Sequence, residues 1–569
     1  MAAVLTILVG FAGRLVQLQI IEGPELAAAA LAQRLTSGTI PAERGDILDA
    51  EGKVLATSGE RYHILADLTL VPTWKHVVDR EIVGTGVEAA AAVLGPVLGI
   101  DPAELAATMI GTSRGKYIAK NVLPETWQAV RAYNITGIAA EQTSVREYPN
   151  GTVAGNVIGF VNAEGVGSAG VEQTYDDALT GTPGSYLRER SPRGHQIPAG
   201  EQERTAAQEG LDTRLTIISD LQWKAQDAIE AEKRRTGATY GFVVVTDVKT
   251  GEVLALGETD TVNPGELGAS DPSTWGSRAV SNVFEPGSTA KVITMAAAIE
   301  TGVVTPTTQF TVPYTYVTPN NQTIKDSHEH ATQRLTATGV FAESSNTGTV
   351  QIGERMTKQV RYDYLAKFGF GERTGVGLPG ESPGILHPVE KWDGRTQWNV
   401  LFGQGVSVNA IQANEVFAII GNGGIKNQPH IVKEFVAEDG TVTPVTLDEP
   451  ERVVSEETAD TVLKMMEAVV TDGTGSLAAI PGYRVAGKTG TAQAANPVTG
   501  KLDHFVASFN GVVPADDPRI AVSVVLYYPS LQYGGNVAAP VFSDVSAFAL
   551  QYLGVEPSSS KIDQFPLEW

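Results

Sequence analysis

The chain has 569 residues, a formal net charge of −23 and no cysteine. Proteins that hold nucleic acid by neutralising phosphates concentrate lysine and arginine on one face, and this acidic chain has no basic run of that kind. Without cysteine the chain can form neither disulfides nor thiolate-ligated metal centres, and it has no thiol nucleophile. The length suits about three or four domains.

An apolar segment opens the chain. The stretch "MAAVLTILVGFAGRLVQLQII" has no charged side chain before Arg14 and continues apolar to Ile21. A membrane-spanning helix needs about 20 apolar residues, and a cleaved signal peptide needs a basic start that is missing here. We therefore predict that residues 1–24 are a transmembrane anchor shortened at its start, with no cytoplasmic segment before it. A buried or interfacial helix is the alternative.

Residues 25–210 alternate short strand-like runs with turns and one alanine-rich helical stretch, without a dense cluster of nucleophile and base. We predict that they form an elongated, mixed α/β pedestal domain with no catalytic role, of the dimerisation type. The polar stretch "RSPRGHQIPAGEQERTAAQEGLD" then separates this half from the next, so we place the domain boundary near residue 210.

The second half opens with the strand "RLTII" and a helix from Ser219, whose side chain can cap it. Two β-rich runs follow, and three more come much later, separated from them by mostly helical patterns: "YGFVVVTD", "GEVLALG", "YRVAGKTGTAQ", "HFVASFNGVV" and "RIAVSVVLYYP". This order predicts an α/β (α+β) domain over residues 211–553, with a central, mostly antiparallel five-stranded sheet flanked by helices. Residues 554–569 follow as a C-terminal tail.

The segment "FEPGSTAKVITMAAAIETG" carries the clearest sign of chemistry. It is apolar nearly all round, which is typical of a buried helix. Ser288 lies at its start, and Lys291, three residues on, shares its face and is the only charge between Pro286 and Ile299. Burial favours a neutral amine, and the helix N-terminus favours developing negative charge, so Lys291 could take a proton from Ser288. The pattern predicts a serine nucleophile activated without histidine.

Such short motifs recur by chance, and the chain contains other copies: Ser-x-x-Lys at Ser558, Ser-x-Asn at Ser344, Ser407 and Ser508, and Lys-Thr-Gly at Lys249 and Lys488. Lys249 bridges two β-runs, which predicts a hairpin turn. The stretch "GYRVAGKT" before and at Lys488 also fits a phosphate-binding loop. Such a loop must lead into a helix, and "KTGTAQAANPVTG" cannot begin a long one. We therefore interpret Lys488 as part of an edge strand.

In chain order, "STAK" at 288, "SSN" at 344 and "KTGT" at 488 resemble the three-part signature of penicillin-recognising enzymes. Three further segments, "IPAERGDILDAEGKVLA", "YPNGTVAGNVIGFVNAEGVGSAGVEQTYDDALTG" and "YGGNVAAPVFSDV", are similar to class B penicillin-binding proteins. These are membrane-anchored peptidoglycan D,D-transpeptidases. The resemblance covers nearly the whole chain, and its segment pattern favours the cell-division branch. Ala50 departs from it, because an arginine is common at that place.

The resemblance implies a role for each motif residue. Ser288 would attack the carbonyl between the two terminal D-alanines of a stem peptide, and Lys291 would accept its proton. Ser344 would relay a proton to the departing D-alanine, Asn346 would hold the peptide amide, and Lys488 would raise the local positive potential. Substrate binding would involve Thr489, Gly490 and Thr491, and the oxyanion hole would consist of the backbone NH groups of Ser288 and Thr491.

The resemblance also implies partners and location. A stem-peptide amine would take the acyl group, and β-lactams would be covalent inhibitors. With no fused glycosyltransferase signature, the glycan polymerase would be a separate polytopic protein of the shape, elongation, division and sporulation family, among other division-complex membrane proteins. The protein would be a single-pass membrane protein, mostly extracytoplasmic, without a cofactor. A catalytically silent scaffold and a penicillin-sensing receptor domain are the alternatives.

The stretch "KDSHEH" suggests a metal site, because Asp326, His328 and His330 alternate and could face one way on a strand. Four well-placed ligands are normally required, and no fourth is evident. We therefore interpret the stretch as a polar loop and predict no metal in the site.

Overall fold

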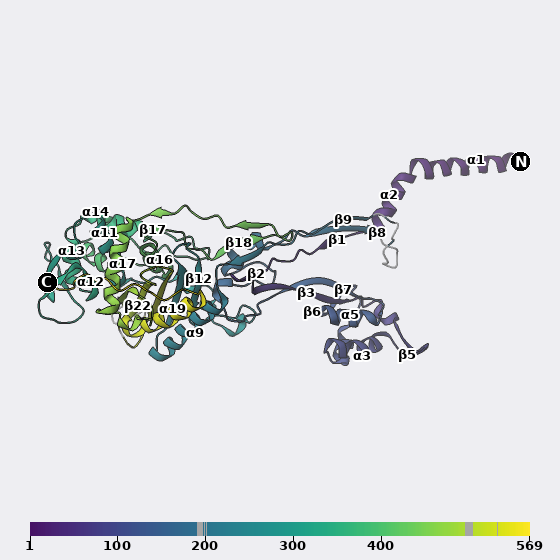
Figure 1. Ribbon diagram of the computed structural model, residues 1–569. Helices are drawn as coiled ribbons and strands as arrows, with labels where there is room; N and C mark the ends of the chain where they lie inside the picture. The colour runs from purple at the N-terminus through teal and green to yellow at the C-terminus, as the bar shows by residue number, and fades with distance from the viewer. Residues whose placement is uncertain (190–196, 198–199, 201, 495–503, 532) are drawn as a thin grey trace. The chain divides into compact units, whose positions relative to one another are not determined.

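The computed structural model describes residues 1–189, 197, 200, 202–494, 504–531 and 533–569 (Figure 1). Parts of the predicted polar stretch 190–212 and of the segment 488–500 therefore lie outside the described residues. By internal contacts the chain divides into two compact units. Unit 1 comprises Met1–Gly45, Ser58–Val145 and Asp177–Leu211, and unit 2 comprises Asp46–Thr57, Arg146–Asp176 and Asp212–Trp569. The predicted boundary near residue 210 stays a prediction.

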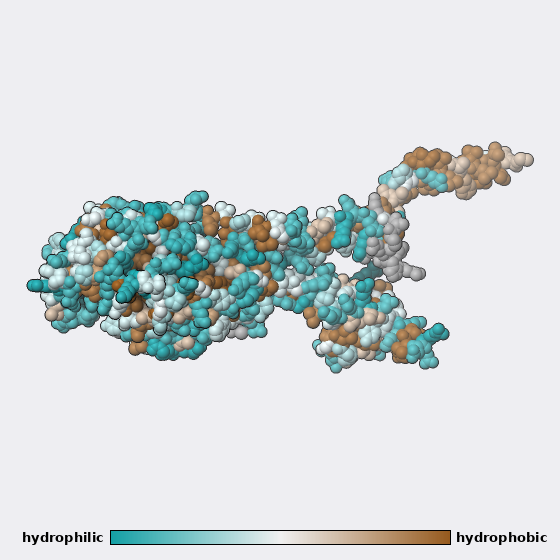
Figure 2. Space-filling view, viewed as in Figure 1, coloured by the Kyte–Doolittle hydropathy of each residue, from teal (hydrophilic) through white to brown (hydrophobic). Residues whose placement is uncertain are grey.

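Unit 1 begins with helices, and the last residue of the second one, Arg34, forms an ion pair with Glu189 at 3.0 Å. Helix α1 (Ala2–Val16) continues into a π-helical turn, Gln17–Ile21, and α2 (Gly23–Arg34) follows. Over Ala2–Ile21 this is the one helix among the described residues that is long and apolar enough to cross a membrane. Figure 2 shows hydrophobic side chains, in brown, over most of its surface.

The remainder of unit 1 has two β-structured parts. One is an antiparallel three-stranded sheet in the order β1 (Leu35–Ile40), β8 (Gly184–Glu189) and β9 (Gln202–Thr205). In the other, β3 (Val54–Ala66) pairs with β6 (Lys116–Val122) and β7 (Ile138–Glu147). Apolar residues of α3 (Gly86–Leu98), α4 (Pro102–Thr108) and α5 (Pro124–Ala132) form a core with these strands. A hairpin of β4 (Lys75–Val78) and β5 (Glu81–Thr85) completes this part.

The centre of unit 2 is a five-stranded sheet whose neighbours are all antiparallel. Its order is β12 (Val253–Glu258), β11 (Tyr240–Asp247), β23 (Ile520–Tyr527), β22 (His504–Val513) and β21 (Ala486–Ala494). Strands from the two ends of the sequence therefore meet at its middle, as predicted. Strand β21, which carries Lys488, forms one edge.

Helices cover both faces of this sheet (Figure 1). Alternate strand residues such as Val522 and Val524 share a core with α9 (Ser219–Thr236) and α19 (Ala539–Tyr552). Ser523 points to the opposite face, where Asn414 of α16 (Ala410–Gly421) donates a hydrogen bond to its hydroxyl at 3.1 Å. Helix α17 (Glu456–Thr471) packs against β21.

Smaller elements surround this sheet in unit 2. The helices that carry or flank motif residues are α11 (Lys291–Glu300), α12 (Ala337–Ala342) and α13 (Asn346–Gly353), and α14 (Lys358–Lys367) packs against α11. The antiparallel strand pairs are β13 (Gln309–Val312) with β16 (Gln333–Thr336), β14 (Thr315–Val317) with β15 (Thr323–Lys325), and β17 (Ile425–Lys426) with β20 (Glu451–Arg452). Strand β18 (Val432–Val436) pairs with β19 (Val442–Pro444) and with β10 (Asp212–Leu215), and β10 pairs in parallel with β2 (Ile47–Leu48).

The predicted cap of α9 is wrong in one respect. Ser219 is the first helical residue rather than the cap, and the capping position falls on Ile218, which has no side-chain acceptor. The Asp49 carboxylate supplies the acceptor instead, taking hydrogen bonds from the backbone NH and the hydroxyl of Ser219. An acidic group at a helix N-terminus satisfies otherwise unpaired NH groups. The segment that provides it lies 170 residues away in sequence.

Candidate active site

Ser288 lies on a short helical turn that precedes a buried helix. The 3₁₀ turn η5 (Gly287–Ala290) runs directly into α11. Gly287 has a φ of +57°, and a Cβ there would come within 3.1 Å of the Thr491 carbonyl oxygen, so glycine permits the turn to approach β21. Ser288 is half-buried and lines a cavity of about 950 Å³ within unit 2. In the part of the chain that the structure describes, its hydroxyl has no hydrogen-bond partner.

Lys291 is buried behind Ser288 and reaches the second motif. The residue is only 1% exposed to solvent. Its Nζ donates to the Ser344 carbonyl oxygen at 2.6 Å and to Asn346 Oδ1 at 2.8 Å, and lies 3.3 Å from Ser344 Oγ. Burial lowers the pKa of Lys291 to about 7, although the charge of Asp326 opposes this. A large neutral fraction is therefore present near neutral pH, as the apolar helix predicted.

Ser344 occupies an unusual backbone position between two helices. It follows α12 and precedes α13, with a φ of +58°. Non-glycine residues rarely adopt this left-handed conformation, and those that do cluster at functional sites. The Ser344 hydroxyl also accepts a hydrogen bond from Lys488 Nζ at 2.9 Å. Two buried amines therefore flank one serine oxygen.

The third motif lies on the edge strand β21. Lys488 is fully buried, and its Nζ also lies 3.3 Å from both the carbonyl oxygen and the hydroxyl of Thr489. Thr489 and Thr491 line the cavity, and the Thr489 hydroxyl is 2.7 Å from that of Thr474. Gly490 does not line it: a Cβ there would clash with Ser508 Oγ and come within 2.9 Å of Thr289 Cγ2. Its glycine thus permits close packing of β21 and η5.

The environment of Lys488 affects its pKa. Burial, and then the nearby Lys291, lower the pKa of Lys488 well below its usual value. Two ammonium groups that share one hydroxyl would repel each other in a medium of low dielectric constant. We therefore infer that protonation of one of these two lysines disfavours protonation of the other.

Comparison with known proteins assigns this site to a family. A model for the penicillin-binding protein transpeptidase domain matches residues 241–547, and one for the penicillin-binding protein dimerisation domain matches residues 39–215. The chain belongs to the penicillin-binding proteins. The sequence-based family prediction and the predicted five-stranded fold are both confirmed.

Relatives of this penicillin-binding protein align along almost its full length. "Penicillin-binding protein PbpB" of Mycolicibacterium smegmatis is 35% identical, with 96% of this chain and 89% of the relative covered. "Peptidoglycan D,D-transpeptidase FtsI" of Escherichia coli is 32% identical, with 96% and 90% covered.

Solved structures give the same result. A peptidoglycan synthetase from Bifidobacterium adolescentis has a TM-score of 0.78 and 35% identity, with 94% of this chain and 100% of that chain covered. Penicillin-binding protein 3 from Mycobacterium tuberculosis, solved in complex with aztreonam, has a TM-score of 0.72 and 31% identity, with 93% and 100% covered.

The additional copies of the three sequence motifs lie outside the candidate active site of this penicillin-binding protein. Lys249 lies in the predicted turn between β11 and β12, where its backbone NH donates to Asp247. Ser558 is bonded to Asp516 on the surface. Ser407 and Ser508 do not line the cavity. Lys488 is in a strand and no helix follows it among residues up to Ala494, so the phosphate-loop alternative fails.

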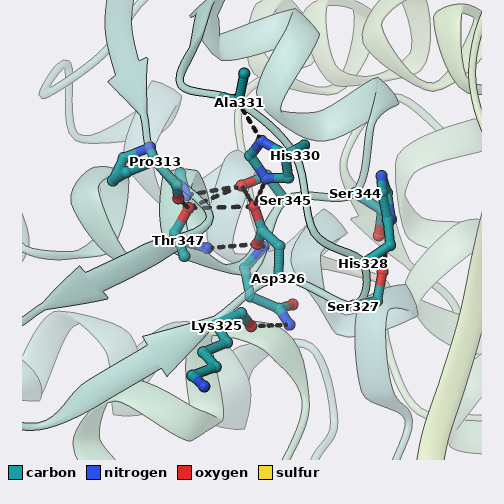
Figure 3. A network of polar contacts seen from close by, with 12 residues as sticks. Pro313, Lys325, Asp326, Ser327, His328, His330, Ala331, Ser344, Ser345 and Thr347 are labelled. Carbon is teal, nitrogen blue, oxygen red and sulfur yellow. Dashed lines mark hydrogen bonds and ion pairs between the residues drawn. The ribbon is translucent and has the colours of Figure 1, made fainter.

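Asp326 and His330 form hydrogen bonds that the sequence did not predict. Asp326 is buried and bonded to the start of α13, and His330 is bonded to Asp326 (Figure 3). His328 instead lies 3.3 Å from the Ser327 hydroxyl. Among the described residues, no three His, Asp or Glu side chains are arranged to hold a metal ion. The sequence offered no local signal for this contact, because Asp326 and its partner, the Asn346 NH, are 20 residues apart.

Proposed function

We propose that this penicillin-binding protein is a peptidoglycan D,D-transpeptidase that cross-links stem peptides through an acyl-enzyme on Ser288. The observation that carries the proposal is Ser344 Oγ, held between Lys291 and Lys488, beside a cavity that Ser288 lines. A serine without histidine needs a neutral amine nearby, and burial supplies it.

In the first half-reaction, Ser288 Oγ attacks the carbonyl carbon between the terminal D-alanines. The Ser288 proton goes to the Lys291 amine, the C–N bond breaks, and an ester on Ser288 replaces the peptide bond. The leaving amine of D-alanine must receive a proton. Ser344 delivers it, because its hydroxyl lies within hydrogen-bond distance of both amines.

The remaining motif residues bind and stabilise the substrate. Asn346 holds the peptide amide, Thr489 and Thr491 hold the terminal carboxylate, and Lys488 raises the local positive potential. Backbone NH groups of Ser288 and Thr491 form the oxyanion hole, where one donor is typically worth about a hundred- to a thousand-fold in rate. Because β21 is a sheet edge, an extended stem peptide can add to it as a further strand, with Gly490 allowing the close approach of the neighbouring turn.

In the second half-reaction, an amine of a neighbouring stem peptide attacks the ester and restores Ser288, so the enzyme is a transferase. β-Lactams present an amide to the same serine. Their acyl-enzymes persist because no leaving group departs and no β-lactamase-type glutamate motif E-x-x-L-N is present in the sequence.

We also propose that Ala2–Ile21 is a single membrane anchor and that the rest of the chain lies outside the cytoplasm. About 20 helical residues span roughly 30 Å, which matches the hydrocarbon core of a bilayer. The sequence segments that resemble the cell-division branch support a septal role. The glycan polymerase would then be a polytopic glycosyltransferase of the shape, elongation, division and sporulation family within the division complex.

The proposal is tested by labelling with a fluorescent penicillin, followed by mapping of the labelled peptide. The expected label is on Ser288, and Ser288→Ala should abolish it. A label on Ser344 or Ser558 would refute the assignment of the nucleophile. Incubation with donor stem peptides and an acceptor amine separates the alternatives: a transpeptidase releases D-alanine and forms cross-linked product, whereas a receptor domain is labelled and forms none.

A further inference from the structure

Asp326 anchors the loop that carries Ser344 and Asn346. Its Oδ1 accepts the backbone NH groups of Asn346 at 2.5 Å and Thr347 at 2.9 Å, and its Oδ2 accepts the Ser345 hydroxyl at 2.8 Å (Figure 3). The Thr347 hydroxyl is 3.2 Å away, but its one proton has a nearer acceptor in the Pro313 carbonyl at 2.8 Å. The side chain of Asp326 is 4% exposed. A buried carboxylate with this many donors is fixed in place.

Asn346 connects this carboxylate to the buried amine. Its backbone NH is bonded to Asp326 Oδ1, while its side-chain Oδ1 accepts a hydrogen bond from Lys291 Nζ at 2.8 Å. The side-chain amide also donates to the Lys325 carbonyl at 3.2 Å, which sets the orientation of Oδ1. The position of Asp326 therefore determines where Lys291 finds its acceptor, and its charge favours the protonated form of Lys291.

His330 adds a second titratable group to the same carboxylate. Its Nε2 lies 2.9 Å from Asp326 Oδ2, and its Nδ1 lies 2.7 Å from the Ala331 carbonyl oxygen. Both neighbours are acceptors, so both bonds form only when the imidazole is doubly protonated. The ring also faces Tyr314 at 6.0 Å and His328 at 5.8 Å, and the charge of Glu343 acts on it, while Lys325 lies over the Tyr314 ring. Burial opposes the charge, but these hydrogen bonds and carboxylates raise the pKa of His330.

We propose that Asp326 and His330 are positioning residues for the acylation of Ser288: Asp326 holds Asn346 against Lys291, and the charge of His330 offsets the charge that Asp326 exerts on Lys291. The inference rests on the proposed function, because it assigns Lys291 as the proton acceptor. Neither residue touches the substrate. With His330 protonated, Asp326 is partly neutralised and Lys291 loses its proton more readily. With His330 neutral, Asp326 holds that proton more firmly.

The test is the pH dependence of acylation by a fluorescent penicillin, measured on the full chain for wild type, Asp326→Asn and His330→Gln. Asn at 326 removes the negative charge, so the acid limb of the rate profile should move to lower pH. Gln at 330 can still donate to Asp326 but carries no charge, so the limb should move to higher pH. We expect opposite shifts of roughly half a pH unit each. The plateau rate of Asp326→Asn should also fall about tenfold, because its amide nitrogen cannot accept the donors at α13.

His328→Gln is the matched control. His328 lies in the same loop but is exposed and is not bonded to Asp326, so its removal should leave the acid limb unshifted. If Asp326→Asn does not fold, His330→Gln decides alone, since it retains the hydrogen bond. Limbs that stay in place, or that move in the same direction in both variants, overturn the inference. A wild-type protein that is not labelled on Ser288 at any pH overturns the proposed function, and the inference with it.

Discussion

The pattern Ser-x-x-Lys occurs twice in unit 2, and only one copy has the surroundings for catalysis. At the start of α11, Lys291 is 1% exposed, and Ser288 has an unpartnered hydroxyl beside a large cavity. At the second copy, Lys561 is exposed, and the Ser558 hydroxyl donates to Asp516 at 2.6 Å and accepts the Arg484 NH at 3.0 Å. The same letters therefore give an activated serine where an amine is buried, and a surface hydrogen bond where it is not. Burial, rather than spacing, creates the base.

The largest expected effect comes from replacing the buried amine itself. Lys291→Arg should reduce the rate of acylation by a fluorescent penicillin by about a hundred- to ten-thousand-fold, the usual contribution of a general base. Arginine stays protonated at any working pH and cannot accept the serine proton. Lys561→Arg is the matched control and should leave the rate unchanged. Equal rates for Lys291→Arg and wild type would remove Lys291 from the mechanism.

A smaller loss is expected at the second buried lysine. Lys488→Arg keeps a donor for Ser344 Oγ, but a guanidinium is bulkier than an amine and Lys488 is fully buried. We expect the acylation rate to fall roughly ten- to a hundred-fold, because the bulkier group displaces the hydrogen bond to Ser344 Oγ from its best geometry. The control is Lys249→Arg in the other Lys-Thr-Gly copy, where the side chain is exposed in a turn. A deeper loss at 488 than at 291 would mean that Lys488 is the proton acceptor.

The pH profile measures the burial effect directly. The reactive form of Lys291 is the neutral amine, and its pKa is lowered to about 7. Acylation should therefore rise with pH up to about 7 and level off above it, and the rate one pH unit below the midpoint should be roughly tenfold below the plateau. Stopped acylation time courses between pH 5 and 9 would give the midpoint. A profile that is flat across this range would show that no group near pH 7 controls the reaction.

Features of the fold and site that depend on neighbouring residues could be predicted from the sequence. Contacts between residues far apart in the sequence could not be predicted from local patterns. Four of the five strands of the central sheet are mainly apolar runs bounded by turn residues, and α11 is mainly apolar, so these were predicted locally, whereas β21 has the polar sequence AGKTGTAQA. Ser288 and Lys291 share one helical face and were predicted as a pair. Lys291 and Ser344 are 53 residues apart in sequence, and Ser344 and Lys488 are 144 residues apart. Their grouping in one site was therefore predicted from the family resemblance, not from local sequence.

Features that depend on long-range partners were missed. The acceptor for the start of α9 is Asp49, from a segment before residue 57, and no local pattern links it to Ser219. The loop with Asp326 suggested a metal site because its acidic and histidine residues alternate along the sequence. In the structure the Asp326 carboxylate instead accepts hydrogen bonds from backbone NH groups, which a sequence pattern cannot show. The proximity of Lys488 and Lys291 was not predicted either, because only the structure shows both amines beside the same hydroxyl.

The smallest expected effect separates the two serines by stability instead of activity. Ser558→Ala removes the bonds to Asp516 and to the Arg484 NH at a partly exposed site, so we expect a loss of about 1 kcal/mol or less. That loss corresponds to a fall in melting temperature of roughly 1–3 °C, with penicillin labelling unchanged. Ser288→Ala should do the reverse, because the Ser288 hydroxyl has no partner in the described structure: the melting temperature stays and the label is lost. Thermal melts and labelling of the same two preparations test both halves. If Ser558→Ala lost its label while its melting temperature held, the surface copy of the motif would have a catalytic role, and burial alone would not explain why one Ser-x-x-Lys reacts.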